Sequence, residues 1–142
     1  MQVFVLNGPN LNRLGTREPE IYGSMTFDEL ADLCRATAAE LGMQAEVRQT
    51  NDEAELIGWL HEAADSRIPV ILNPAAFTHY SYALRDACSM LTAPLIEVHL
   101  SNPLSREEFR HTSVVSGVAT GTIAGFGSTS YVLALQALVR QA

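Results

Sequence analysis

The chain has 142 residues, of which 47% are hydrophobic and 18% charged, as expected for one compact domain rather than a disordered chain. Its formal net charge of −7 argues against binding to nucleic acid or anionic membranes, because their phosphate groups would repel it. All nine basic residues are arginine. The absence of lysine excludes Schiff-base chemistry and a P-loop.

The composition also indicates the cellular compartment in which the protein is expected. The two cysteines, Cys34 and Cys88, fall at inward positions of predicted helices and are interpreted as small core residues. No apolar run is long enough to span a membrane. Residues 1–7 have no basic start and no cleavage-site pattern, so they do not resemble a signal peptide. We expect a cytoplasmic protein in which residues 1–142 form a single domain.

The chain opens with a strand, a long loop and a helix. Residues 2–6 form a continuous apolar run, which is typical of a strand covered on both faces. A loop rich in Gly, Pro and Asn is expected over residues 7–24. Thr26 and Glu29 form a capping box, which predicts a helix that ends at Gly42.

The same alternation continues to the end of the chain. Further strands are expected at residues 45–49, 69–72, 94–100 and 118–124. One helix is expected to follow Asp52, and a short one to span residues 105–109. Another is expected between them with an inward face formed by Ala83, Leu84, Ala87, Cys88 and Leu91, and the last is expected to begin at Ser128 or Thr129. Alternating strands and helices predict an α/β fold, a three-layer sandwich with a five-stranded parallel sheet in the flavodoxin-like order. Ligands of such folds bind beyond the carboxyl ends of the strands.

Polar residues collect at these strand ends, within residues 7–10, 73–79 and 97–102. Asn, Pro and Ser also make ordinary turns, so any one loop has two interpretations. Glu97 and His99 are two residues apart on one strand, so their side chains share a face. A carboxylate beside an imidazole can fix its tautomer and raise its pKa. Taken alone, His99 is better interpreted as a partly buried structural histidine, and no short ligand spacing indicates a metal.

The long loop contains Arg17 and Tyr22. Long loops in compact domains are often lids over a site. A tyrosine, with an ordinary pKa of about 10, becomes a useful base when an adjacent arginine stabilises the phenolate. Without further information, a loop tyrosine and a solvated arginine remain the alternative.

Long motifs are similar to the type II 3-dehydroquinate dehydratases. They include the opening signature over residues 7–23, Asn73-Pro-x-x-x-Thr-His-x-Ser81, and Pro94-Leu-Ile-Glu-Val-His-Leu-Ser-Asn102, and they cover essentially the whole chain in order. The resemblance implies a hydro-lyase that removes water from 3-dehydroquinate with anti stereochemistry, through an enolate and without a cofactor. The product would be 3-dehydroshikimate.

The resemblance also implies a role for individual residues. Tyr22 matches the base, Arg17 the arginine that activates it, and His99 the acid that Glu97 orients. Asn10 matches a residue that stabilises the enolate through an ordered water. The expected substrate-binding residues are Asn73, His79, Leu100, Ser101 and Arg110, together with Asp86, which would reach the site of a neighbouring subunit. The sequence departs from the family at Ala75, Ala76 and Tyr80, where we expect an altered pocket wall.

The family assembles as a tetramer of trimers, so a homododecamer is expected. Asp86 also turns away from the apolar stripe of its helix, although such a residue can simply solvate a surface. The reaction could serve the shikimate pathway, and thus chorismate and aromatic amino-acid biosynthesis, or the breakdown of quinate. A flavin- or phosphate-binding flavodoxin-like protein is a competing hypothesis, against which the first loop lacks a glycine-rich phosphate cradle. A family member that binds the ligand without converting it is the other alternative.

Overall fold

A computed structural model describes residues 1–16 and 18–141. Its centre is a parallel sheet of five strands in the order β2-β1-β3-β4-β5. The strands are β1 (Gln2–Asn7), β2 (Gln44–Gln49), β3 (Val70–Asn73), β4 (Leu95–His99) and β5 (Gly121–Ala124). This order is the flavodoxin-like one, so the predicted fold class is confirmed.

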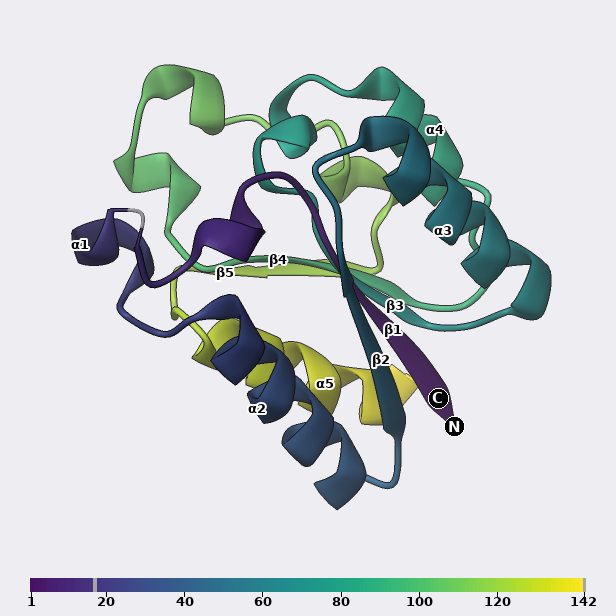
Figure 1. Cartoon of the computed structure of the whole chain (residues 1–142). Helices are drawn as coiled ribbons and strands as arrows, with labels where there is room; N and C mark the ends of the chain where they lie inside the picture. Colours follow the sequence, from purple (N-terminus) through teal and green to yellow (C-terminus); the bar gives the residue numbers. More distant parts are fainter. Residues whose placement is uncertain (17, 142) are drawn as a thin grey trace.

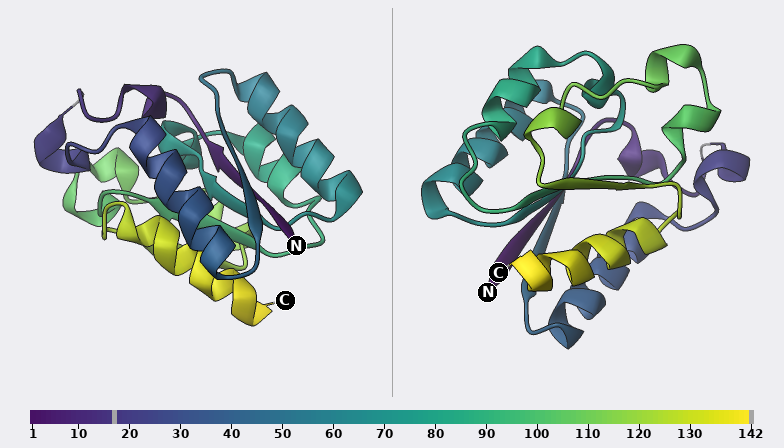
Figure 2. Two further views of the ribbon diagram at one scale, coloured as in Figure 1. Left: turned by 60° about the horizontal axis from the view of Figure 1, so that its bottom comes forward. Right: turned by 180° about the vertical axis from the view of Figure 1, so that it is seen from behind.

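Helices cover both faces of the sheet and make three layers (Figure 1). The helices are α1 (Pro19–Tyr22), α2 (Phe27–Glu40), α3 (Glu53–Ser66), α4 (Tyr82–Cys88) and α5 (Thr129–Gln141). On one face α2 and α5 lie side by side, and on the other α3 and α4 do, as the rotated views also show (Figure 2). The predicted capping box of Thr26 and Glu29 begins α2, and the side chain of Asp52 caps α3.

Two apolar cores result because successive strand residues point to opposite faces. Val3 and Val5 of β1 pack toward α2 and α5, whereas Phe4 and Leu6 pack toward α3 and α4. Cys34 and Cys88 are buried in these two cores, as predicted, and burial raises the pKa of each thiol to about 12. Both thiols therefore stay protonated at neutral pH.

Several predicted boundaries were wrong. The loop over residues 7–24 contains a 3₁₀ turn (Leu11–Arg13) and α1, and its first residue still belongs to β1. Residues 105–109 do not form one helix, because extended backbone at Arg106 separates two 3₁₀ turns, Pro103–Ser105 and Glu108–Arg110.

Two further expectations were too broad. β5 begins only at Gly121, since Ser116–Val118 forms a 3₁₀ turn before it. The helix α4 ends at Cys88 and does not reach Leu91, and Ala83 on it is exposed rather than buried.

A close approach between loops shapes the carboxyl edge of the sheet. The backbone N–H of Gly8 donates to the carbonyl of Asn73 at 2.8 Å. A side chain at Gly8 would place its Cβ 2.6 Å from the carbonyl oxygen of Pro74, so only glycine fits. This contact brings the loop after β1 against the loop after β3, where the predicted site residues lie.

Candidate active site

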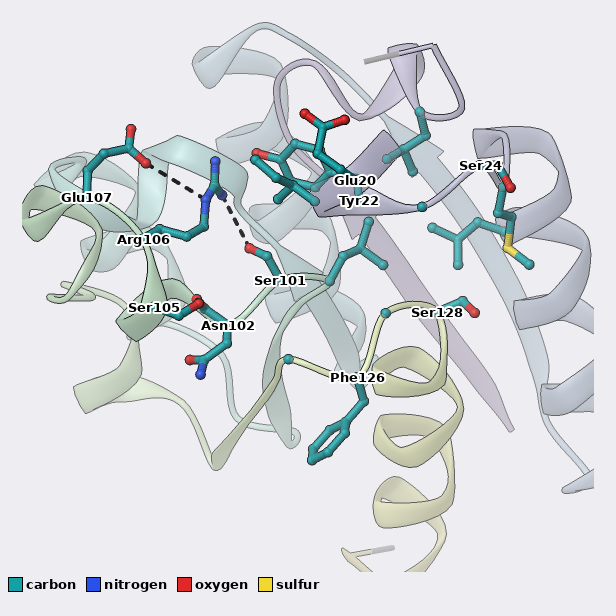
Figure 3. A pocket seen from close by; sticks show the side chains of 18 residues that line it. Glu20, Tyr22, Ser24, Ser101, Asn102, Ser105, Arg106, Glu107, Phe126 and Ser128 are labelled. Atoms are coloured by element: carbon teal, nitrogen blue, oxygen red, sulfur yellow. Dashed lines mark hydrogen bonds and ion pairs between the residues drawn. The ribbon is translucent and has the colours of Figure 1, made fainter. Parts of the chain in front are cut away.

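Two adjoining hollows open at the carboxyl edge of the sheet. The outer hollow, of about 810 Å³, lies between the segment after α1 and the turns that follow β4 and β5 (Figure 3). The inner hollow has a volume of about 230 Å³. Both are lined by Tyr22, Leu100, Ser101 and Arg106.

The inner hollow gathers most of the residues that the sequence nominated. It is lined by Asn10, Tyr22, Asn73, His79, His99, Leu100, Ser101 and Arg110. These residues come from three regions of the chain that are distant in sequence, namely residues 10–22, 73–79 and 99–110. The inner hollow is therefore the candidate active site, although the outer hollow is larger.

Glu97 and His99 form a hydrogen-bonded pair on β4. His99 Nε2 lies 2.5 Å from Glu97 Oε2, so the predicted proximity on one strand face is confirmed. The Glu97 side chain is fully buried, and the His99 side chain is 11% exposed. With Nε2 directed at the carboxylate, Nδ1 is the ring nitrogen that remains to meet a ligand.

Hydroxyl groups complete the environment of Glu97. Thr78 Oγ1 donates to Glu97 Oε2 at 2.6 Å, and Ser116 Oγ donates to Oε1 at 2.8 Å. Ser113 Oγ lies 3.0 Å from both carboxylate oxygens. Burial alone would raise the pKa of Glu97, but the hydrogen bond and charge of His99, together with the hydroxyls, hold that pKa below its usual value. The carboxylate is thus ionised at neutral pH.

Tyr22 lies at the end of α1 and faces Arg106. The guanidinium carbon of Arg106 is 5.1 Å from the centre of the Tyr22 ring, within cation–π range. Arg106 Nη1 also donates to Ser101 Oγ at 3.3 Å, and its side chain reaches the space beside Tyr22 (Figure 3). Arg106 was not predicted from the sequence to belong to the site. The predicted partner of Tyr22, Arg17, lies outside the described residues.

Asn10 stands on a left-handed turn at the rim of the inner hollow. Its φ of 71° is a conformation that asparagine tolerates better than most residues. The backbone N–H of Asn10 donates to Asn51 Oδ1 at 2.9 Å, and Gln49 Nε2 donates to the same oxygen at 3.1 Å. Asn51 thereby anchors the turn that carries Asn10 to the cavity.

A buried polar network holds Asn73, which lines the cavity. Tyr131 Oη donates to Asn7 Oδ1 at 2.6 Å and accepts from Asn73 Nδ2 at 2.9 Å. Asn73 Oδ1 accepts from the backbone N–H of Ala75 at 3.0 Å. Complete burial raises the pKa of Tyr131, so this phenol is a structural donor and not a base. The Nδ2 amide of Asn73 has a second hydrogen, which takes part in neither of these two contacts.

His79 and Arg110 supply the remaining polar wall. His79 Nδ1 lies 2.9 Å from the carbonyl of Thr112, and Arg110 Nε donates to Glu107 Oε1 at 3.1 Å. Burial is the main reason that the pKa of His79 is lowered. A neutral imidazole that uses Nδ1 internally can present Nε2 to a hydroxyl group.

Asp86 lies outside this cavity. It is exposed on α4, where Arg85 is its ion-pair partner at 3.6 Å. The expectation that it turns away from its own core is confirmed, whereas its service to a neighbouring subunit stays a prediction.

Of the three positions at which the sequence departs from the family, two lie in the pocket wall as predicted and one does not. Ala75 and Ala76 line the inner hollow, as expected. Tyr80 does not belong to the residues that line it and is 59% exposed, with its ring packed edge-on against Phe77. Tyr80 sits at the end of the 3₁₀ turn Ala75–His79, so its side chain points to solvent instead of the pocket wall.

Sequence reasoning did not assign Thr78, Ser113, Ser116 and Arg106 to the site. Thr78 lay within a recognised motif, but a motif does not say which atom a hydroxyl contacts, and Arg106 lay outside the motifs described above. Ser113 and Ser116 gave no local signal, because serine is common in turns.

Within residues 1–16 and 18–141, no group of three or more His, Cys, Asp or Glu side chains is arranged to hold a metal ion. No helix in the same residues has the length and apolar character needed to cross a membrane.

With this geometry established, relatives of the chain become informative. Residues 1–139 match the family model described as dehydroquinase class II. The chain belongs to the class II dehydroquinase family. It is similar to a 3-dehydroquinate dehydratase from Salinispora tropica, with 61% identity over all of this chain and 99% of the relative. A protein of the same name from Mycobacteroides abscessus is 58% identical, with the same coverage of both chains.

Similar solved structures support the same family assignment. A type II dehydroquinase from Propionibacterium acnes has 57% identity and a TM-score of 0.96, with 98% of this chain and 96% of that one covered. A type II dehydroquinase from Butyrivibrio crossotus has 41% identity and a TM-score of 0.95, with 97% of each chain covered. The predicted family is thus confirmed, and membership makes the chain an enzyme of the hydro-lyase class.

Proposed function

We propose that the chain is a single catalytic domain that converts 3-dehydroquinate to 3-dehydroshikimate and water by anti elimination. The observation that carries the proposal is the pairing of buried Glu97 with His99 in a cavity that Tyr22 also lines. An acid and a potential base thus face one small space. The names of the relatives supply the substrate.

Proton removal comes first in the proposed mechanism. Tyr22, as phenolate, takes the proton alpha to the ketone, and the electron pair moves onto the ketone oxygen to give an enolate. Arg17 is proposed to stabilise the phenolate, and Arg106 lies close enough to contribute positive charge. Asn10 stabilises the enolate oxygen through a water that donates a hydrogen bond.

Loss of water completes the reaction. The enolate electrons re-form the ketone and create the carbon–carbon double bond, while the beta hydroxyl departs with a proton from His99. Glu97 orients the ring and stabilises its positive charge before transfer. Tyr22 is left protonated and His99 neutral, and solvent exchange restores both.

The remaining polar groups are proposed to hold the substrate. The backbone N–H groups of Leu100 and Ser101 would bind the carboxylate, because such donors suit an anion. Asn73, His79 and Arg110 would bind the ring hydroxyls, and all three line the inner hollow. No metal or organic cofactor takes part in this mechanism.

A biosynthetic role in the cytoplasm is the cellular part of the proposal. The reaction would supply the shikimate pathway toward chorismate and the aromatic amino acids. The same chemistry in quinate catabolism is the alternative, and it would be distinguished by whether loss of the chain makes cells require aromatic amino acids.

A ligand-binding role without turnover is the second candidate, and one observation favours it. Ala75, where the sequence departs from the family, lines the cavity with a φ of 52°, a conformation in which alanine is strained. The acid and base assignments favour catalysis instead.

Ultraviolet absorbance tests catalysis directly. Purified protein mixed with 3-dehydroquinate should develop the absorbance of the conjugated enone of 3-dehydroshikimate. Arg17→Ala should lose most of this rate, and an absence of absorbance change with the wild-type protein would refute the proposed activity. Binding of 3-dehydroquinate without conversion would establish the second candidate.

The working unit is proposed to be a homo-oligomer, a dodecamer built from trimers, in which Asp86 completes a neighbouring site. The exposure of Asp86 outside its own cavity supports this. If Asp86→Ala is strongly impaired, mixing it with Tyr22→Phe and reassembling the subunits should restore activity, because some sites receive both intact residues. A fully active monomer in sedimentation experiments would contradict the oligomeric requirement.

A further inference from the structure

The surroundings of Glu97 contain more hydrogen-bond donors than the orientation of one histidine requires. Its carboxylate is fully buried on β4. Besides His99, three hydroxyls contact it, from Thr78, Ser113 and Ser116. These hydroxyls come from the 3₁₀ turn after β3 and from two positions in the long connection between β4 and β5. Three separate positions of the chain thus converge on one side chain.

A hydrogen-bonded carboxylate and imidazole share a proton that can reside on either group. If it resides on the imidazole, His99 is a cation and can protonate a leaving group. If it resides on the carboxylate, both groups are neutral and the acid is lost. Burial favours the neutral pair, because charges are costly in an apolar interior. Hydrogen bonds donated to the carboxylate favour the charged pair.

We propose that the Thr78 and Ser116 hydroxyls are positioning groups that keep the shared proton on His99 and off Glu97. The inference rests on the proposed function in that His99 is taken as the acid. Each hydroxyl donates a hydrogen bond to a different carboxylate oxygen of Glu97: Thr78 to Oε2 at 2.6 Å, and Ser116 to Oε1 at 2.8 Å. Both carboxylate oxygens are therefore held in the ionised form.

Ser113 has a different part in the network. Its Oγ accepts hydrogen bonds from the backbone N–H groups of Val115 and Ser116, at 3.1 and 3.0 Å. It therefore organises the turn that presents Ser116. Its single hydrogen can go to Glu97 or to Thr78, whose hydroxyl lies 2.7 Å away. Ser113 is thus a poor test residue, because its removal would also disturb the loop.

The other titratable groups near Glu97 do not replace these hydroxyls. His79, in the turn after β3, interacts electrostatically with both Glu97 and His99, and burial lowers its pKa. Cys88 on α4 also interacts with Glu97, but its thiol pKa of about 12 keeps it neutral. Apart from His99, the hydroxyls are the side chains among the described residues that contact the two carboxylate oxygens directly.

The experiment follows both partners of the pair by NMR in the free protein, after the wild type has been shown to convert 3-dehydroquinate. The ¹³C shift of the Glu97 carboxyl and the ¹⁵N shifts of the His99 ring are recorded against pH. Thr78→Val and Ser116→Ala remove one hydroxyl each. Thr78→Ser keeps the hydroxyl, and Thr50→Val removes a buried threonine hydroxyl at the end of β2.

In the wild type, acidification should protonate the His99 ring while Glu97 keeps the shift of a carboxylate. Each hydroxyl deletion should move the protonation of Glu97 upward by about one pH unit, as expected for a lost hydrogen bond to a charged group. The kcat should fall about tenfold with little change in KM. Thr78→Ser and Thr50→Val should resemble the wild type in both titrations.

Unchanged Glu97 and His99 titrations in folded Thr78→Val and Ser116→Ala would overturn the inference. A wild-type protein that does not convert 3-dehydroquinate would instead overturn the proposed function, a separate result obtained before any variant is made. If one deletion prevents folding, the other still decides, because the two hydroxyls act on different oxygens.

Discussion

The two proposed proton-transfer groups of the cavity are held in very different ways. His99 lies on the sheet, is 11% exposed, and bonds to a carboxylate that is itself fully buried. Tyr22 ends a helix of four residues in which no residue is buried. That helix is flanked by left-handed backbone at Glu18 and Gly23. The proposed acid is thus part of the folded core, whereas the proposed base is carried by a surface segment.

Because of this difference, substitutions at the two positions should affect folding stability and reaction rate to different extents. A change at Glu97 disturbs a buried polar network and should therefore affect folding as well as rate. A change at Tyr22 removes a group from a partly exposed position and should affect rate with little effect on folding. Variants on the two sides therefore test the comparison itself.

The largest expected effect is that of Tyr22→Phe. Loss of the base hydroxyl should lower kcat by about 10⁴-fold, the upper end for general acid–base catalysis. The temperature of unfolding should stay near that of the wild type, because α1 contributes no buried residue. Steady-state kinetics and calorimetry provide the measurement, and near wild-type turnover in a folded variant would end the assignment of the base.

His99→Ala should follow, with a loss of about 10³-fold in kcat. The three hydroxyls still hold Glu97, so the variant is expected to fold. Full activity in this variant would mean that another group protonates the leaving hydroxyl. Titration of the remaining rate against pH is the sharper measurement, since the dependence due to His99 should disappear.

Glu97→Gln should cost less rate, about 10²-fold, but it should also cost stability. The amide loses the charge that its donors bind, which corresponds to about 1–3 kcal/mol at pH 7. Because the pKa of Glu97 is lowered in the folded state, its contribution is present above the unfolded value of about 4.3 and is lost as pH falls through the lower folded value.

Urea unfolding at pH 7 and pH 3 therefore tests the contribution of the buried Glu97 carboxylate to stability. The difference in unfolding free energy between wild type and Glu97→Gln should be largest at pH 7 and should shrink toward pH 3. An equal difference at both values would contradict the ionised state assigned to Glu97.

The smallest expected effect concerns the cavity wall. Ala75→Gly should raise the free energy of unfolding by up to about 1 kcal/mol, because alanine is strained at a φ of 52°. Ala76→Gly is the matched control, since Ala76 does not have positive φ, and it should be neutral or destabilising. Thermal unfolding of the pair measures this, and equal shifts would remove the strain assigned to Ala75.

Much of the sheet side could be predicted from the sequence. Alternation along β4 placed Glu97 and His99 on one face, and the capping box of Thr26 and Glu29 located the start of α2. These features depend on local periodicity and on side chains that act within one element. Parallel strands then bring their carboxyl ends together, so the location of the cavity also followed.

The surroundings of Tyr22 and the hydroxyl network around Glu97 could not be predicted in the same way. Short turns such as Ser116–Val118 depend on which distant group their hydroxyls reach, and here that group is Glu97. The contact of Arg106 with Tyr22 likewise joins two loops far apart in sequence. No periodic pattern encodes such contacts, and the family motifs identify residues without identifying their partners.

The central claim is that a base on α1 and an acid on the sheet act on opposite faces of one substrate. Stereospecifically deuterated 3-dehydroquinate tests it most directly, with the label at the carbon between the ketone and the departing hydroxyl. If the deuterium lies anti to that hydroxyl, the protein should release 3-dehydroshikimate without the label. Retention of an anti deuterium, with loss of the hydrogen on the same face as the hydroxyl, would contradict the account.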